Sequence, residues 1–229
     1  MLQITPSKIE SSTATNNYGS VAKIYEKLAH LYSAGQVLES KRSQLKYLKP
    51  GDRVLYVGAG AGEDVILAAE KGIDVTVVEL SQAMLDRISG RLQQKGLQDQ
   101  VTLIQGDAFL FADEKAFDVV IANFFLNVFS EDTMPKMLNH LVSLLRAGGL
   151  LLIADFAPPQ GHWFNRFLLK AYHAAAVTVF RLVANNPFHP IYDYEKHFSS
   201  LSLELKDKEY FSLLFSTAKW YRALTAKKL

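Results

Sequence analysis

Short apolar runs alternate with amphipathic stretches through the middle of the chain. The runs are rich in Val, Ile and Leu, and most positions within them are apolar. Strands of a parallel sheet are covered on both faces, so such runs are typical of them. The pattern predicts five strands, at Arg53–Val57, Asp74–Glu79, Val101–Gln105, Phe117–Asn123 and Leu150–Asp155.

The stretches between these runs have helical spacing and end near glycines. They predict helices over Asp64–Lys71, Ser81–Lys95 and Asp132–Arg146. A regular alternation of strands and helices indicates an α/β fold in which crossover helices cover both faces of a parallel sheet. We therefore expect a Rossmann-like, doubly wound sheet.

The N-terminal part of the chain departs from this alternation. Residues 1–19 are rich in Ser, Thr and Asn and are expected to form a disordered lead-in. Apolar positions in Ser20–Tyr47 recur at helical spacing, and Gly35 interrupts them, which predicts two helices. We expect a single domain over residues 20–229, opened by this helical segment.

The C-terminal third also breaks the pattern. After the fifth strand, a Pro-Pro-Gln-Gly sequence leads into a long, aromatic-rich helical stretch. We interpret residues 158–192 as a helical cap that covers a substrate pocket, although the same helix could instead pack on the sheet or on another subunit. Two further strands are expected near Leu203–Leu213 and Ser216–Thr225.

Composition narrows the class of protein. The net charge of +2 over 229 residues is close to balanced, which argues against a nucleic-acid binder. The chain has no cysteine, so disulfides and thiolate metal sites are excluded, and a cytoplasmic location is expected. No apolar run is long enough for a membrane-spanning helix, whereas contact of the aromatic helix with a membrane surface stays open as a third possibility.

A glycine-rich turn follows the first predicted strand, in the sequence Val57-Gly58-Ala59-Gly60-Ala61-Gly62. Glycines allow a sharp turn and a close approach of the backbone to a ligand. The dinucleotide fingerprint G-x-G-x-x-G would need a third glycine at position 63, which is Glu63. A carboxylate beside a pyrophosphate is unfavourable, so the spacing favours a cofactor without phosphates.

Glu79 is the acidic partner of this turn. It ends the second strand, 21 residues after Gly58, where a carboxylate can accept hydrogen bonds from both hydroxyls of a ribose. The turn and Glu79 together predict a nucleoside-containing cofactor, of which S-adenosylmethionine (SAM) is the example without phosphates.

Five segments carry a family resemblance. They are VLYVGAGAGED (Val54–Asp64), VTVVELS (Val75–Ser81), QGDAF (Gln105–Phe109), FDVVIANF (Phe117–Phe124) and RAGGLLLIADF (Arg146–Phe156). The region from Tyr47 to Asp155 resembles the class I SAM-dependent methyltransferases, in the small-molecule branch similar to ubiquinone/menaquinone methyltransferases. The resemblance implies a seven-stranded, mostly parallel sheet whose last strand is antiparallel.

The resemblance also implies the cofactor residues. SAM would be the cofactor and S-adenosylhomocysteine (SAH) the product. The implied contacts are Gly58, Ala59 and Gly60 with the methionine part, Glu79 with the ribose, Leu80, Met84, Asp107 and Ala108 with the adenine, and Asn123 near the sulfonium. One departure stands out, because the family has an acidic residue where this chain has Tyr56. Separately, tyrosines at seven-residue spacing in the N-terminal helix could form a packed helix face, or Tyr25 could close over the cofactor.

Candidates for a catalytic base lie at or after the fifth strand. Asp155 ends that strand, and His162, His173 and His189 lie in the segment where the family builds its substrate pocket. No histidine pair has metal-ligand spacing, so no metal is expected.

The sequence thus predicts a methyltransferase that acts on a small, apolar or aromatic molecule. Two alternatives stay open: a SAM-binding protein or enzyme without methyl transfer, and an NAD-dependent oxidoreductase, which the glycine spacing disfavours. The oligomeric state cannot be read from the sequence.

Overall fold

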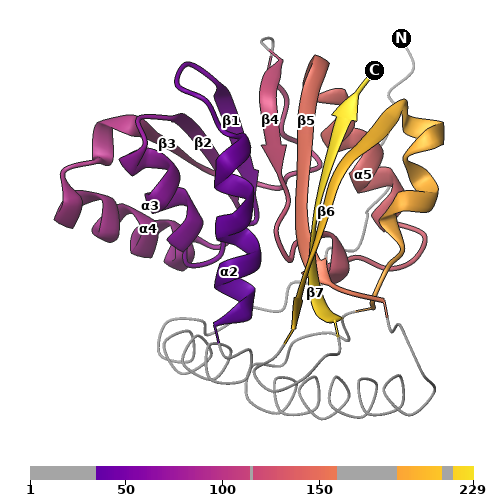
Figure 1. Ribbon diagram of the computed structural model, residues 1–229. Coiled ribbons are helices and arrows are strands. Elements are labelled where there is room, and N and C mark those ends of the chain that lie inside the picture. Colours follow the sequence, from indigo (N-terminus) through magenta and orange to yellow (C-terminus); the bar gives the residue numbers. More distant parts are fainter. Residues whose placement is uncertain (1–34, 114–115, 159–189, 213–218) are drawn as a thin grey trace, which may run out of the picture.

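The computed structural model describes residues 35–113, 116–158, 190–212 and 219–229. These residues form a seven-stranded sheet with the order β3-β2-β1-β4-β5-β7-β6 (Figure 1). The strands are β1 (Arg53–Val57), β2 (Asp74–Glu79), β3 (Val101–Gln105), β4 (Phe117–Ile121), β5 (Leu145–Phe156), β6 (Leu203–Ser212) and β7 (Lys219–Lys228). Strands β1 to β5 run parallel, and β7 runs antiparallel to both β5 and β6. The predicted Rossmann-like sheet with an antiparallel last strand is confirmed.

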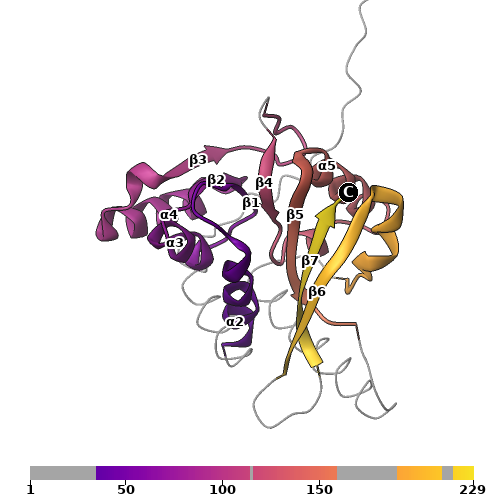
Figure 2. The ribbon, with the colours of Figure 1, turned by 45° about the horizontal axis from the view of Figure 1, so that its top comes forward.

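Helices cover both faces of the sheet. They are α2 (Gln36–Arg42), α3 (Glu63–Glu70), α4 (Gln82–Lys95) and α5 (Met134–Ser143), with short 3-10 turns η1 (Ser43–Tyr47), η2 (Gln98–Gln100), η3 (Leu126–Val128), η4 (Tyr194–His197) and η5 (Ser199–Leu201). Helices α2, α3 and α4 lie on one face, and α5 with η4 and η5 lies on the other, as the turned view in Figure 2 also shows. Each face therefore has its own hydrophobic core.

The predicted boundaries agree closely in the first half of the sheet. Strands β1, β2 and β3 begin and end at the predicted residues. The second N-terminal helix is present as α2 and η1, after Gly35 in a left-handed conformation with φ of 80°. Each apolar run here is bounded by turn residues, so periodicity and turn chemistry agree.

The boundary between α5 and β5 was predicted wrongly. The helix ends at Ser143 and not at Arg146, and β5 already begins at Leu145 instead of Leu150. Leu145 pairs with Phe117, and the register shifts before Leu150 pairs with Val119. The Ala-Gly-Gly sequence that indicated a helix end is therefore an irregularity inside a longer strand.

Several predicted features lie outside the described residues. These are the lead-in, the first N-terminal helix with Tyr25, and nearly all of the cap at residues 158–192. The lead-in and the cap stay predictions. In the ranges that the structure does describe, no helix is long and apolar enough to cross a membrane. Those ranges also hold no cluster of three or more His, Asp or Glu side chains that could bind a metal ion.

Candidate active site at the carboxyl edge of the sheet

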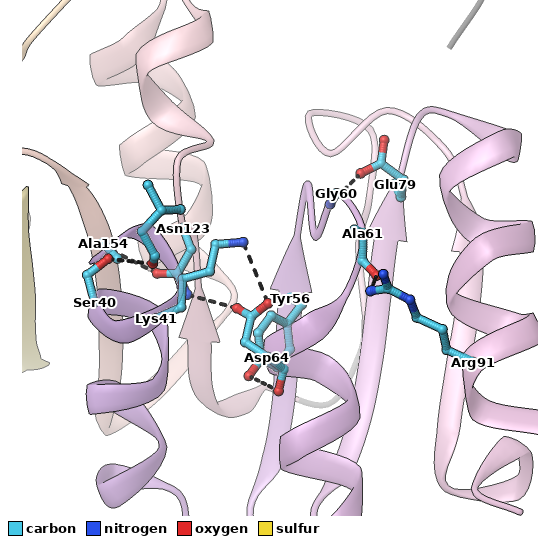
Figure 3. A network of polar contacts seen from close by, with 11 residues as sticks. Ser40, Lys41, Tyr56, Gly60, Ala61, Asp64, Glu79, Arg91, Asn123 and Ala154 are labelled. Atoms are coloured by element: carbon cyan, nitrogen blue, oxygen red, sulfur yellow. Dashed lines mark hydrogen bonds and ion pairs between the residues drawn. The ribbon is translucent and has the colours of Figure 1, made fainter. Parts of the chain in front are cut away.

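The glycine turn lies at the carboxyl end of β1, between β2 and β4. Strand order reverses at this point, because β1 pairs with β2 on one side and with β4 on the other. Open α/β sheets bind ligands at such a switch point. Gly58, Gly60 and Gly62 all have positive φ, of 61°, 55° and 69°. The side chain of Arg91 on α4 holds the turn by donating to the carbonyl of Ala61 at 2.8 Å (Figure 3).

The three glycines differ in what surrounds them. A Cβ on Gly58 would lie 2.3 Å from the ring of Phe125, and one on Gly62 would lie 2.6 Å from Ile88. Among the residues that the structure describes, none lies within 4 Å of a Cβ on Gly60. Gly58 and Gly62 are therefore required by packing within the protein, whereas no described residue crowds Gly60.

Glu79 ends β2 with its side chain turned toward this glycine turn. Its carboxylate accepts a hydrogen bond from the backbone N–H of Gly60 at 3.3 Å (Figure 3) and another from the N–H of Ser81 at 3.0 Å. Burial raises the pKa of Glu79, and these N–H donors oppose that rise. The carboxylate thus joins the ends of β1 and β2.

The residues predicted to contact adenine line the same edge, beyond β2. Leu80 is 71% exposed although it is a large apolar side chain. Met84 is half-buried and Ala108 is buried. The exposed carboxylate of Asp107 accepts the backbone N–H of Phe109 at 2.9 Å. An apolar side chain and a carboxylate are therefore presented to one side of Glu79.

On the β4 side of the turn, Asn123 makes two internal hydrogen bonds. Its Nδ2 donates to Asp64 at 3.1 Å, and its Oδ1 accepts the N–H of Ala154 at 2.8 Å. Asn123 therefore ties the end of β4 to β5 and to α3. Its predicted place near the sulfonium stays a prediction.

Asp64 occupies the first turn of α3 and is 1% exposed. Lys41 of α2 lies above it, with Nζ 3.6 Å from Oδ1 (Figure 3). Tyr56 is buried beneath, and its hydroxyl contacts the backbone carbonyl of Asp64 at 3.4 Å. Position 56, which is acidic in the family, is thus a buried tyrosine here, and the neighbouring carboxylate is that of Asp64 on α3.

Asp155, predicted as a catalytic candidate, is 2% exposed. Its carboxylate accepts hydrogen bonds from Asn127 at 2.7 Å, from the N–H of Phe156 at 2.7 Å and from the hydroxyl of Tyr194. Arg222 lies opposite on β7, because the two residues are register partners. Asp155 is therefore enclosed by protein groups.

Burial raises the pKa of Asp155 to about 6, and its hydrogen bonds and the charge of Arg222 oppose the rise. Burial and the neighbouring carboxylate raise the pKa of Tyr194 well above its usual value, so Tyr194 acts as a neutral donor. The Arg222 guanidinium is itself 1% exposed and pairs with Glu195 at 3.0 Å. As a catalytic base, Asp155 stays a prediction.

Phe124 follows Asn123 and has a φ of 52°, one of two positive values at non-glycine residues in the described ranges. Its N–H donates to Ala154 at 2.8 Å, and its ring packs edge-on against Phe156 and Tyr221. Strained backbone of this kind concentrates at functional sites. Residue type alone gave no signal for this strain, since we expect Phe at a strand end to be a core residue.

The structure brings ten of the fourteen predicted site residues to the described carboxyl edge. The other four, Tyr25, His162, His173 and His189, lie outside the described residues. Sequence reasoning assigned no role to Lys41, Tyr194 or Arg222. Their contacts join elements far apart in the chain, which periodicity does not reveal.

Comparisons with known proteins agree with this arrangement. A methyltransferase domain family matches residues 54–149. A ubiquinone/menaquinone biosynthesis C-methyltransferase of Teredinibacter turnerae is 31% identical over 163 residues, which are 68% of this chain and 62% of the relative. A phosphatidylethanolamine N-methyltransferase of Cereibacter sphaeroides is 32% identical over 148 residues, 62% of this chain and 71% of the relative.

A solved structure of a SAM-dependent methyltransferase from Methanosarcina mazei shares the fold. The TM-score is 0.62 at 17% identity, over 80% of this chain and 95% of that one. The chain spans less than two thirds of the length of some curated relatives, such as the Teredinibacter protein. Sheet order, glycine turn and sequence similarity lead to one conclusion: the chain belongs to the class I SAM-dependent methyltransferases, and it is similar to the ubiquinone/menaquinone methyltransferases.

Proposed function

We propose that this protein transfers the methyl group of SAM to a small, apolar or aromatic molecule. The observation that carries the proposal is the position of Glu79, whose carboxylate meets the glycine turn at the sheet's switch point. Family membership supports methyl transfer and sets aside the oxidoreductase alternative. The names of the relatives, which include quinone and phospholipid methyltransferases, support an acceptor with a large apolar part.

The described residues fit SAM. Gly60 leaves space that a Cβ would fill, Leu80 offers an exposed apolar surface, and Glu79 offers a carboxylate at the end of β2. In the proposal, Glu79 holds the ribose hydroxyls, and Leu80 with Met84 lies against the adenine. Asp107 and Ala108 receive the adenine edge, while Gly58, Ala59 and Gly60 lie along the methionine part.

When bound, SAM supplies a methyl group on a positively charged sulfur. An acceptor can attack the methyl carbon in line with the carbon–sulfur bond, and SAH is the leaving group. Such a reaction depends mainly on alignment of the two partners and on exclusion of water. The rigid turn between β1 and α3 supports alignment, because its glycines are fixed by Arg91 and by packing against Phe125 and Ile88. The aromatic rings of Phe124 and Phe156 supply an apolar wall at the ends of β4 and β5.

Some features of the proposal rest on the sequence alone. The proton acceptor is assigned by prediction to Asp155 or to one of His162, His173 and His189. A small-molecule acceptor in place of a nucleic acid is supported by the near-balanced charge. A cytoplasmic location is supported by the absence of cysteine.

A screen of acceptors tests the proposal. The protein is incubated with SAM and with panels of quinols, phenols, lipid amines and duplex RNA, and SAH release is followed together with the mass of the product. We expect SAH release with an apolar or aromatic small molecule, and a greatly reduced rate for Glu79→Gln. SAM binding without transfer to any acceptor would favour the alternative of a SAM-binding protein, and methylation of the RNA alone would overturn the substrate class.

A further inference from the structure

We propose that Asp64 and Lys41 together bind the amino acid end of SAM, with Asp64 taking its α-ammonium and Lys41 its α-carboxylate. This inference rests on the proposed function and deepens it. It assigns the charged end of the cofactor to two residues that come from α3 and α2 and not from the strand β1.

The Asp64 carboxylate is buried but incompletely satisfied. Its Oδ2 accepts a hydrogen bond from Asn123 at 3.1 Å, whereas Oδ1 accepts none from any residue that the structure describes. Buried polar atoms in folded proteins are almost always hydrogen-bonded, so an exception calls for an explanation. A donor supplied by a ligand would satisfy Oδ1.

Lys41 does not fill this role itself. Its Nζ lies 3.6 Å from Oδ1, which is an ion-pair distance but too long for a hydrogen bond. The Lys41 side chain is 16% exposed, and its ammonium lies beside the 1% exposed Asp64 carboxylate (Figure 3). An incoming ammonium can therefore replace Lys41 at Oδ1, and the displaced Lys41 keeps its charge beside the ligand.

The pair has the charge pattern that an α-amino acid requires. A zwitterion carries an ammonium and a carboxylate on one carbon atom, so its site needs an anion and a cation side by side. Asp64 and Lys41 provide these two charges on neighbouring elements. Hydrogen bonds to charged groups are among the stronger polar contacts, which makes such a site selective.

The position along the sheet is also suitable. Glu79 ends β2, which lies on one side of β1. Asn123, which donates a hydrogen bond to Asp64, follows β4 on the other side of β1. At a strand spacing of about 4.8 Å the two sides are about 10 Å apart. If Glu79 holds the ribose on the β2 side of the glycine turn, the amino acid part of SAM has room on the β4 side. Tyr56 offers no charge there, whereas the buried carboxylate of Asp64 lies next to it.

Calorimetry with two ligands tests the inference. SAH contains the amino acid, whereas 5′-methylthioadenosine has the same adenine, ribose and sulfur but lacks it. For Asp64→Asn and Lys41→Met we expect SAH affinity to fall about 10- to 100-fold, while methylthioadenosine affinity changes less than about twofold. Arg42→Met, an exposed cation next to Lys41 on the same helix, is the matched control and should change neither affinity.

Three outcomes overturn the inference. Both variants could bind SAH as tightly as the wild type. Both could lose affinity for the two ligands equally, which would indicate damage to the fold or to the whole site. In the third outcome the wild-type protein binds neither ligand. This result would contradict the proposed function as well, and it differs from the first two because they concern the variants alone. Lys41→Met guards against a folding defect in Asp64→Asn, because the Lys41 side chain is only partly buried.

Discussion

Asp155 makes the stability of this protein depend on pH in a way that can be measured. Its pKa is raised from 3.8 to about 6 because the carboxylate is buried between β5, β7 and η4. The folded protein therefore holds a proton on Asp155 at pH values where the unfolded chain has released it. Stability from this group is present at low pH and is lost as the pH rises through about 6.

The magnitude follows from the two pKa values. Between pH 5 and pH 7.5, linkage gives a loss of about 1.4 kcal/mol in the free energy of unfolding, out of about 3 kcal/mol for the complete shift. Asp155→Asn removes the titration but keeps an acceptor for Tyr194. Asn127 can also reorient, since its own Oδ1 has no hydrogen-bond partner among the described residues.

Urea unfolding of wild type and Asp155→Asn at both pH values is the assay. Other titrating groups are common to the two proteins, so the difference between their pH dependences isolates Asp155. We expect the unfolding free energy of the wild type to fall by about 1.4 kcal/mol more than that of the variant when the pH is raised from 5 to 7.5. Equal pH dependences would refute the view that the buried Asp155 carboxyl takes up a proton near pH 6.

The remaining predictions concern the turn and the buried cation. Gly62→Ala should lower the unfolding free energy by about 2 to 4 kcal/mol, because it adds strain at positive φ and a clash with Ile88. Gly60→Ala, which adds strain alone, should cost about 1 to 2 kcal/mol; equal losses would contradict this reading of the turn. Arg222→Met should cost about 3 kcal/mol in denaturant unfolding, since it removes the buried cation that faces Asp155 while Glu195 keeps only Lys208, and a neutral effect would show that the network is dispensable.

The sequence predicts the sheet well where each strand is a single apolar run. Strands β1 to β3 match because each run is closed by turn residues. The Ala-Gly-Gly sequence in β5 predicts a helix end, and this prediction is wrong because a glycine pair carries the same local signal in both settings. Only the pairing of Leu145 with Phe117, a contact between distant residues, decides between the two.

Some residues of the candidate site can likewise be recognised from local sequence, whereas others depend on contacts between distant residues. Gly58, Gly60 and Glu79 are recognisable because their roles follow from position relative to one strand. The pairs Lys41–Asp64 and Asp155–Arg222 depend on sheet order and register, which no local pattern encodes. The Tyr56 substitution signalled a change on this side of the turn, and the structure shows a buried phenol with a carboxylate from α3 beside it.

Calorimetric titration of the wild type and of Glu79→Gln with SAM, with NAD as the competing ligand, tests the central claim most directly. We predict saturable binding of one SAM per chain, no saturable binding of NAD, and an affinity for SAM about 10-fold or more lower in Glu79→Gln because ribose hydroxyls lose a charged acceptor. Saturable NAD binding without SAM binding, or unchanged SAM affinity in Glu79→Gln, would contradict it.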